Sequence, residues 1–313
     1  MNNFLYCLDS NYNIPACCSI YSLLENSKDK VNIFIMHKDF NNSDFLPNKI
    51  IKHPKLNEIT IFQVDLSNYD FPNIFGTHVS EATYYRLFLQ DYINEDTEYI
   101  TYLDCDVFCI NDPGTLINEN IEKIKSSGFT ISTFLEPGLT DHSTNILKMK
   151  TDKYFNAGVM IIDFKKWKLS DLKNNSLRII KEHKEKLLYW DQDTLNLYFN
   201  DQYEPLPEAL NFKVDMAVDN KANKISISEL ETISLLHYSG KFKPWSVRGA
   251  VNDNAEYFQE IYRSLYSKKY YLAINYKKNA LYDIIISIFN RTLFRTKHPL
   301  ALFWYTVKSF LKR

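Results

Sequence analysis

Short apolar runs that alternate with helix-compatible segments constrain the fold of this chain more than any other feature. The run Phe4–Leu8 precedes helical spacing over Ala16–Leu24. Two further runs, Val31–Met36 and Glu58–Val64, are rich in Ile, Val and Phe and are separated by a polar, helix-compatible segment. This alternation predicts a mainly parallel α/β sheet with helices on both faces. At 313 residues, the chain can form one large α/β domain with an appendage, or two ordinary domains.

The alternation continues through the rest of the chain. Ser80 is predicted to cap a helix that runs to about Tyr92, and the strand Tyr99–Leu103 follows it. The chain has only seven glycines and no internal repeat, which excludes a Gly-rich phosphate loop or a dinucleotide fingerprint. A nucleotide would therefore be held by a metal and by side chains. The later strands and helices are expected at Phe129–Phe134, Phe155–Asp163, Leu177–Leu188, Asp191–Phe199 and Ile233–Leu236.

Acidic residues stand where two of the predicted strands end. Asp9 follows the first strand, and Asp104 and Asp106 follow Tyr99–Leu103. In open α/β sheets, ligands bind beyond the carboxyl ends of the strands. In an extended chain Asp104 and Asp106 point the same way and Cys105 points opposite. Two adjacent carboxylates repel each other unless a cation lies between them, so the pair indicates a site for a divalent metal and a diphosphate. Taken alone, the triplet also describes a solvated, acidic strand end.

His237 stands at another predicted strand end, after the apolar run Ile233–Leu236. An imidazole that joins two carboxylates makes a mixed nitrogen and oxygen site, which suits Mn²⁺ better than a thiolate zinc site does. Gly240 would allow a ligand to approach the backbone closely. Lys243 could neutralise a phosphate, or it could be an exposed loop lysine.

Two further stretches carry polar side chains that could meet a ligand. Asn156 and the small residue Ala157 precede a buried apolar strand, where small residues leave room for a sugar ring. Asn156 can donate to and accept from sugar hydroxyls, or its side chain can form an Asx-type turn. Arg86 could hold a phosphate or carboxylate with two parallel hydrogen bonds, or it could form a structural ion pair.

The stretch from Trp190 to Asn196 is predicted to start a helix with acids near its N-cap. One of the two acids, Asp191 or Asp193, is expected to cap this helix. The other acid and Gln192 would then face the pocket.

These blocks, in their order and spacing, resemble the signature blocks of glycosyltransferase family 8. The resemblance runs from Phe4 to about Trp245 and is strongest to the retaining bacterial lipopolysaccharide galactosyl- and glucosyltransferases. It implies a GT-A fold, in which a Rossmann-like nucleotide-sugar domain carries a mixed central sheet. It also implies a UDP-hexose donor and Mn²⁺, with Mg²⁺ as a possible substitute.

The resemblance further implies roles for individual residues. Asp104, Asp106 and His237 would ligate Mn²⁺, and His78 would contact the acceptor. The other implied donor and cofactor contacts are Asp9 and Asn11 on uracil and ribose, Cys105 between the metal ligands, Gly240 and Lys243 on the diphosphate, and Arg86, Asn156, Ala157, Asp191 and Gln192 around the sugar.

The mechanism implied by a UDP leaving group requires stabilisation of the charge that develops on the β-phosphate. Retention can proceed by double displacement or by front-face attack. Asp191 and Asp193 are better nucleophiles in kind than the weakly basic amide of Gln192. We expect front-face attack through an oxocarbenium-like transition state, with Gln192 supporting the reacting centre electrostatically.

The charge of the chain is uneven along its length. The whole chain carries −1, whereas the stretch 263–313 holds eleven Lys or Arg residues and one acid, so its formal charge is about +10. Residues 1–262 are thus acidic, which argues against nucleic acid as a partner. Residues 263–313 form a basic, aromatic tail with two short segments, Asn279–Phe289 and Pro299–Leu311. Such a composition is typical of segments that lie on an anionic membrane. The alternative is a helical pair packed on the body with a solvated basic face.

The expected location is the cytoplasm, on the inner face of the cytoplasmic membrane. No Lys or Arg precedes Lys28, so a secretory signal peptide is not expected, and no apolar stretch is long enough to span a bilayer. The five cysteines are odd in number and lack a Cys-x-x-Cys pair, as expected for buried, reduced thiols.

The acceptor remains open at this point. The basic tail favours a lipid-borne glycan such as lipopolysaccharide or lipooligosaccharide. A glycan on a surface protein, hydrolysis of the UDP-sugar, and binding of the nucleotide sugar without catalysis are the alternatives. Galactose and glucose donors are equally compatible, because they differ in one epimeric hydroxyl. The sequence alone does not assign an oligomeric state.

Overall fold

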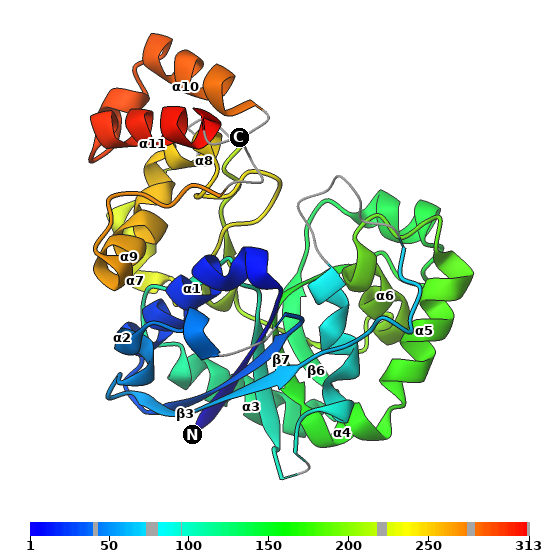
Figure 1. Cartoon of the computed structure of the whole chain (residues 1–313). Helices are drawn as coiled ribbons and strands as arrows, with labels where there is room; N and C mark the ends of the chain where they lie inside the picture. The colour runs from blue at the N-terminus through cyan, green and yellow to red at the C-terminus, as the bar shows by residue number, and fades with distance from the viewer. Residues whose placement is uncertain (40–42, 73–80, 95, 218–223, 274–278, 312–313) are drawn as a thin grey trace.

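A seven-stranded mixed sheet forms the centre of the molecule (Figure 1). The computed structural model describes residues 1–313 except 40–42, 73–80, 95, 218–223, 274–278 and 312–313. In spatial order the strands are β3 (Leu56–Gln63), β2 (Val31–His37), β1 (Asn2–Leu8), β4 (Tyr99–Leu103), β7 (Phe155–Asp163), β6 (Ile131–Leu135) and β8 (Glu204–Pro205).

Among the seven strands of this sheet, β7 runs opposite to the other six. The strands β3, β2, β1 and β4 run parallel, and β7 is antiparallel to both of its neighbours. All nine residues of β7 are buried, as expected for a strand covered on both faces. The predicted α/β class and the mixed GT-A sheet are confirmed, and β4 and β7 begin and end at the predicted residues.

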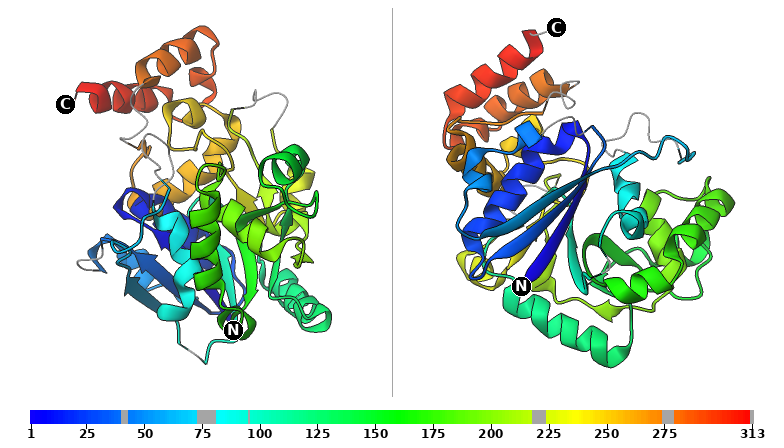
Figure 2. Two further views of the ribbon diagram at one scale, coloured as in Figure 1. Left: turned by 90° about the vertical axis from the view of Figure 1, so that its right-hand side faces the viewer. Right: turned by 60° about the horizontal axis from the view of Figure 1, so that its bottom comes forward.

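Helices cover both faces of the sheet (Figure 2). Successive residues of a strand point to opposite faces, so Leu5 of β1 packs in one hydrophobic core and Tyr6 in the other. The Tyr6 core includes side chains of α1 (Asn13–Asn26), α2 (Asn48–Ile51), α3 (Gly114–Ser127) and α9 (Glu256–Tyr266). The Leu5 core includes side chains of η3 (Glu81–Asp91), α4 (Phe164–Leu169), α5 (Leu172–His183) and α6 (Trp190–Phe199).

A second, three-stranded sheet brings distant residues to the end of β4. It consists of β5 (Val107–Cys109), β10 (Leu235–His237) and β9 (Phe212–Lys213). The antiparallel register pairs His237 with Val107, which directly follows Asp106. This pairing places the predicted imidazole beside the predicted carboxylates.

The helix predicted to run to about Tyr92 is present as the 3₁₀ run η3, with a non-helical residue at Phe88, and its predicted cap Ser80 lies outside the described residues. Three residues per turn place Thr83 and Arg86 on one side of η3, where they contact each other.

The helix predicted at Leu177–Leu188 is α5, which starts earlier and ends at His183. Its buried stripe is Leu172, Ser176 and Ile180, and the next position of that stripe would be Lys184. Lys184 is exposed and pairs with Asp70 instead, so the chain leaves the helix there.

The C-terminal part is a pair of helices, α10 (Ala280–Phe289) and α11 (Pro299–Leu311), packed on the short helix α8 (Val247–Ala250). A small third core around Ile284 and Leu302 joins them to the body. Helix α9 runs through the predicted boundary between residues 262 and 263. Within the described part of the chain, no helix combines the length and the apolar character needed to cross a bilayer. All five cysteines are buried free thiols, as predicted.

Candidate active site

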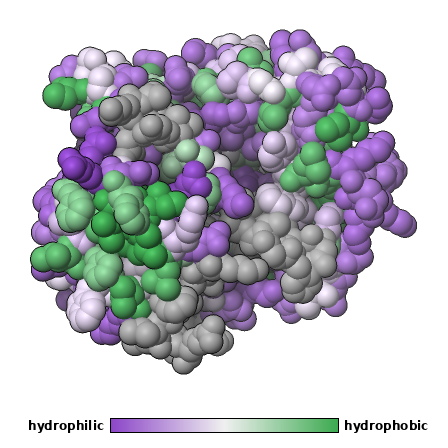
Figure 3. Space-filling view, turned by 90° about the horizontal axis from the view of Figure 1, so that it is seen from above, coloured by the Kyte–Doolittle hydropathy of each residue, from purple (hydrophilic) through white to green (hydrophobic). Residues whose placement is uncertain are grey.

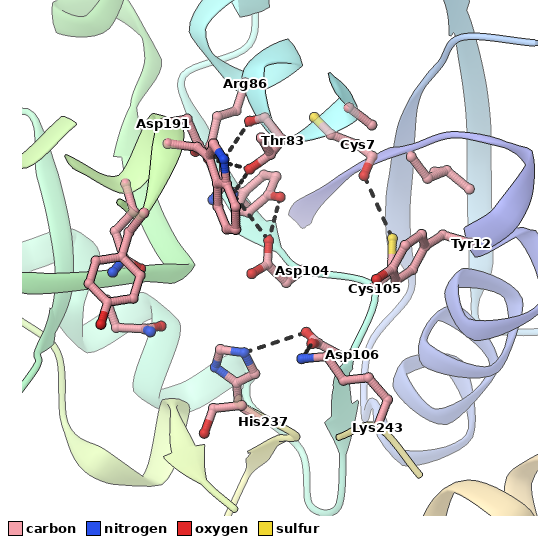
Figure 4. Close-up of a pocket in the computed structure, with 18 of the residues that line it drawn as sticks. Cys7, Tyr12, Thr83, Arg86, Asp104, Cys105, Asp106, Asp191, His237 and Lys243 are labelled. Atoms are coloured by element: carbon pink, nitrogen blue, oxygen red, sulfur yellow. Dashed lines mark hydrogen bonds and ion pairs between the residues drawn. The ribbon is translucent and has the colours of Figure 1, made fainter. Parts of the chain in front are cut away.

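A pocket opens at the carboxyl ends of β1 and β4, where α/β sheets bind ligands (Figure 4). Arg86, Thr83 and Asp191 lie on one side of it, and Asp106, His237 and Lys243 lie on the other, with Asp104 between them. The remaining residues that line the pocket are Cys7, Leu8, Tyr12, Ala82, Tyr102, Cys105, Asn156, Tyr189, Trp190, Gln192, Ser239 and Gly240.

The two aspartates reach the pocket from a turn, not from an extended strand. β4 ends at Leu103, and the N–H of Val107 donates to the carbonyl of Asp104 at 3.1 Å. Both carboxylates nevertheless face the pocket, and the Sγ of Cys105 points to the carbonyl of Cys7 at 3.7 Å. The predicted orientation is therefore present, although the strand geometry assumed for it is wrong.

Asp104, Asp106 and His237 form a cluster of potential metal ligands. One ligand atom from each residue lies within 4.8 Å of the other two. The Oδ1 atom of Asp106 is buried, accepts no hydrogen bond from the described residues, and lies 3.4 Å from Nε2 of His237. Two carboxylates and an imidazole are ligands that Mn²⁺ and related divalent cations accept. The residues present therefore fit a divalent cation.

Lys243 lies beneath this cluster and is not an exposed loop lysine. Its side chain is 7% exposed, and Nζ lies 2.5 Å from Oδ2 of Asp106 and 2.8 Å from the carbonyl of Tyr238. Burial acts to raise the pKa of Asp106, but Lys243 and His237 together hold that pKa well below its ordinary value. Asp106 is therefore an ionised carboxylate at neutral pH.

Gly240, in the loop that leads to Lys243, adopts a left-handed backbone conformation with φ of +80°. A Cβ at this position would lie 3.2 Å from Oδ1 of Asp215. The backbone angle therefore favours glycine, and a larger residue would also press on the carboxylate of Asp215.

Arg86 forms the ion pairs that were one of its two predicted roles. Its Nε lies 2.7 Å from Oδ2 of Asp191, and Nη2 lies 3.3 Å from Oδ1 of Asp104. The guanidinium stacks over the Tyr102 ring at 4.2 Å and also donates to the carbonyl of Ala157. Arg86 thus neutralises two carboxylates at once.

Burial raises the pKa of Asp191 to about 6, although Arg86 and a hydrogen bond from Thr83 oppose this effect. Its side chain is only 3% exposed. Asp191 is consequently much nearer to titration at physiological pH than Asp106 is.

The start of α6 differs from the prediction that an acid caps the helix. The N-cap residue is Tyr189, and its side chain makes no capping hydrogen bond. Asp193 lies in the first turn, is fully buried, and accepts hydrogen bonds from the Tyr189 N–H and from His142, both at 2.8 Å. Asp193 is not among the pocket-lining residues, whereas Asp191 and Gln192 are.

The amide of Gln192 is held at both ends. Its Oε1 accepts from the N–H of Ala157 at 2.9 Å, and its Nε2 donates to the hydroxyl of Tyr154 at 3.2 Å. Tyr154 in turn donates to Asp193. Ala157 itself contributes only backbone groups and is not one of the pocket-lining residues.

Asn156 lines the pocket and also makes the predicted Asx-type hydrogen bond. Its Oδ1 accepts from the N–H of Gly158 at 3.0 Å, and its Nδ2 donates to Glu136 at 3.0 Å.

The residues predicted to contact the nucleoside lie beside the pocket and do not line it. Asp9 accepts from the N–H of Asn11 at 2.9 Å and caps the short helix η1 (Ser10–Tyr12). Neither Asp9 nor Asn11 is among the described pocket-lining residues, although Leu8 and Tyr12 on either side of them are. His78 lies outside the described residues.

Tyr102 and Asn211 are contacts of the site that the sequence argument missed. The hydroxyl of Tyr102 donates to Oδ1 of Asp104 at 2.6 Å, and Oδ1 of Asn211 lies 2.8 Å from Nδ1 of His237. The spacing of two residues between Tyr102 and Asp104 is a signal that could have found the first contact. No local signal connects Asn211 with His237.

The sequence of the chain is similar to those of known proteins. The family model for glycosyl transferase family 8 matches residues 3–249. The lipopolysaccharide 1,3-galactosyltransferase of Salmonella typhimurium is 24% identical over 253 residues, which cover 79% of this chain and 74% of that protein. The lipopolysaccharide 1,2-glucosyltransferase of Escherichia coli K12 is 26% identical over 273 residues, which cover 82% of this chain and 76% of that protein.

A similar fold occurs among solved structures. The crystal structure of the galactosyltransferase LgtC in complex with donor and acceptor sugar analogues superposes with a TM-score of 0.69. It is 22% identical in sequence, and the match covers 84% of this chain and 96% of that one. This similarity concerns the fold.

Proposed function

Because the chain belongs to glycosyltransferase family 8, we propose that it is a retaining enzyme that transfers galactose or glucose from a UDP-sugar to a glycan acceptor. We assign Asp104, Asp106 and His237 as ligands of Mn²⁺, or of Mg²⁺ in its place. The observation that carries the proposal is the convergence of these three residues at the carboxyl end of β4.

The charges of the pocket support a metal and a diphosphate together. Its lining contains the three carboxylates of Asp104, Asp106 and Asp191 and the two cations of Arg86 and Lys243, which gives a formal charge of about −1. A divalent cation would reverse that charge to about +1. The pocket would then attract a diphosphate, which it would otherwise repel.

The chemistry of the transfer places different demands on the two sides of the pocket. A bound divalent cation acts as a Lewis acid for the charge that develops on the departing diphosphate. Lys243 adds a second positive charge next to Asp106. We assign Asp9 and Asn11, at the end of β1, to the uracil and ribose, and Gly240 to the diphosphate. His78 is proposed as an acceptor contact.

Retention is proposed to proceed by front-face attack. The amide of Gln192 is fixed by Ala157 and Tyr154, so its dipole has a set orientation at the pocket before the sugar binds. Asp191 is engaged by Arg86 and Thr83, and Asp193 is buried away from the pocket lining. These contacts favour an electrostatic role for Gln192 and Asp191 over a covalent one.

A UDP-release assay tests the proposed reaction. The protein is incubated with UDP-galactose, UDP-glucose or UDP-N-acetylhexosamines, with and without Mn²⁺ and lipid-linked glycan acceptors. We expect Mn²⁺-dependent UDP release that accelerates when the acceptor is added. Release unaffected by acceptor indicates a hydrolase, and binding without release indicates a nucleotide-sugar binding module.

We also propose that the tail, residues 263–313, holds the enzyme on the inner face of the cytoplasmic membrane, near a lipid-borne acceptor such as lipopolysaccharide. Apolar side chains gather on the face formed by α10 and α11 (Figure 3). Phe289 is 82% exposed and Trp304 is 69% exposed, and the exposed basic residues Arg291 and Lys308 lie on the same two helices or next to them. Exposed apolar and basic side chains together suit an anionic interface.

Vesicle sedimentation tests this membrane proposal. The double variant Phe289→Ser, Trp304→Ser should lose most of its binding to vesicles that contain anionic lipid. Leu169→Ser, which removes a 79% exposed leucine from the body, is the matched control and should bind like the unchanged protein. Equal binding of all three proteins would contradict the proposal and would favour a surface-protein glycan as the acceptor.

A further inference from the structure

A line of polar side chains leads from the back of the pocket to His237. Glu136, which pairs with Lys213, accepts from Nδ2 of Asn156 at 3.0 Å. Oδ1 of Asn156 accepts from Nδ2 of Asn211 at 3.0 Å, and Oδ1 of Asn211 faces Nδ1 of His237 at 2.8 Å. Asn211 is fully buried and Asn156 is 9% exposed, so water does not substitute for these contacts.

The direction of every hydrogen bond in this line follows from the chemistry of its first members. A carboxylate paired with a lysine only accepts, so Glu136 must face the NH₂ group of Asn156. A backbone N–H only donates, so the N–H of Gly158, 3.0 Å away, must face the oxygen of Asn156. The amide of Asn156 is thus oriented from both sides.

The orientation of the Asn156 amide in turn fixes that of Asn211, and Asn211 fixes the tautomer of His237. The Asn156 oxygen requires a donor from Asn211, which is its NH₂ group. The other end of Asn211 is therefore an oxygen, and it requires the proton of His237 on Nδ1. In the neutral ring this leaves the lone pair on Nε2, which faces Oδ1 of Asp106 at 3.4 Å.

The ring of His237 is also held in place by packing. Gly158 lies against it, and a Cβ at position 158 would collide with Cε1 of the imidazole. The same Cβ would lie 3.0 Å from Oδ2 of Asp104. Only glycine lets the ring and this carboxylate approach each other so closely.

We infer that Glu136, Asn156 and Asn211 are positioning residues that fix the tautomer and ring orientation of His237, so that Nε2 is presented to a divalent cation together with Asp104 and Asp106. The inference rests on the proposed metal site and adds residues that support it from behind. Partners on the second nitrogen of a metal-binding histidine orient the ring and raise its basicity. Asn156 consequently contributes to the donor site through His237, with both acceptor positions of its oxygen already used by Gly158 and Asn211.

The affinity of the full chain for Mn²⁺, without nucleotide sugar, tests this inference. Free Mn²⁺ is followed by its electron paramagnetic resonance signal while the ion is titrated into the protein. Asn211→Leu should weaken binding about 10- to 100-fold. Asn120→Leu makes the same change at a buried asparagine on α3 and should leave the affinity unchanged.

The His237→Gln variant distinguishes positioning from general disruption. In that background, Asn211→Leu should cause no further loss of Mn²⁺ affinity, because its effect acts through the imidazole. A further loss as large as in the unchanged protein would overturn the inference, as would unchanged affinity of Asn211→Leu alone. If the unchanged protein binds no Mn²⁺, the metal proposal and this inference both fail.

Nuclear magnetic resonance of the ¹⁵N-histidine-labelled protein provides a second readout, which does not depend on metal affinity. At a pH where the ring is neutral and no metal is present, His237 should show a protonated Nδ1 and an unprotonated Nε2. The His237→Gln spectrum identifies its signals. The opposite tautomer would overturn the inference.

Discussion

Two buried ion pairs lie on opposite sides of the pocket, and their carboxylates behave differently. Asp106 pairs with Lys243, and its pKa stays well below the ordinary value. Asp191 pairs with Arg86, yet burial raises its pKa to about 6. Both acids are almost fully buried, so the difference comes from how much positive charge each one receives.

The geometry explains this difference. Lys243 lies 2.5 Å from Asp106, and His237 lies beside the other carboxylate oxygen at 3.4 Å. Arg86 divides its charge between Asp191 and Asp104. The carboxylate of Asp106 therefore stays ionised and is suited to bind a metal, whereas the carboxyl group of Asp191 has a pKa close to physiological pH. The comparison teaches that burial alone does not set the charge state of a pocket acid.

The largest effect is expected from Asp104→Ala, which removes the carboxylate that lies between the two sides. Transfer measured by UDP release should fall by at least about 100-fold, and Mn²⁺ affinity should fall with it, because one of three ligands is lost. Asp70→Ala removes an 89% exposed acid outside the pocket and is the control. An active Asp104→Ala variant would contradict the assignment of Asp104 as a metal ligand.

A comparison of Asp106→Asn with Asp191→Asn tests the two sides against each other. Asp106→Asn leaves the buried Lys243 without a countercharge and should lower the free energy of unfolding by about 3–5 kcal/mol. Asp191→Asn should cost less than half as much, because Arg86 keeps Asp104 as a partner. Urea unfolding at pH 7.5 measures both values. Equal losses would contradict the difference in charge state.

The pH dependence of stability should reveal the raised pKa of Asp191. Its pKa is about 6 in the folded protein and near 3.8 when the chain is unfolded, so between these values the folded state binds the proton more tightly. The contribution of Asp191 to the free energy of unfolding is present at about pH 4 and is lost as the pH rises to about 6. The total loss should be about 3 kcal/mol.

The difference in unfolding free energy between the unchanged protein and Asp191→Asn isolates this contribution. Between pH 4.5 and about pH 6, the unfolding free energy of the unchanged protein should fall relative to that of Asp191→Asn. From about pH 6 to 7.5 the difference should stay constant. A pH-independent difference would show that Asp191 is as fully ionised as Asp106.

The smallest effect is expected from Tyr102→Phe, which removes the hydroxyl that donates to Asp104 at 2.6 Å. Asp104 is partly exposed, so the loss in unfolding free energy should be about 1 kcal/mol, with a few-fold loss of Mn²⁺ affinity. Tyr99→Phe, in the same strand, is the matched control. Identical results for the two variants would mean that Tyr102 does not orient Asp104.

Much of the fold was predictable because its signals are local. The strands β4 and β7 were predicted to the residue, since each is a continuous apolar run with clear ends. The 3₁₀ winding of η3 and the end of α5 were not predicted, because they depend on which side chains the neighbouring elements bury. The acids at the end of β4 and the imidazole at the end of β10 were likewise visible as motifs.

The partners of those motifs were decided only by the tertiary structure. The sequence by itself determined the α/β class and the residue types gathered at the strand ends, since these follow from local periodicity, and the resemblance of its motif blocks indicated the family. Whether Arg86 meets a ligand or Asp191, whether Lys243 is exposed or buried, and which amide lies behind His237 depend on contacts between residues far apart in the chain. Such contacts depend on distances of a few ångströms and on burial, and neither is encoded in any single segment.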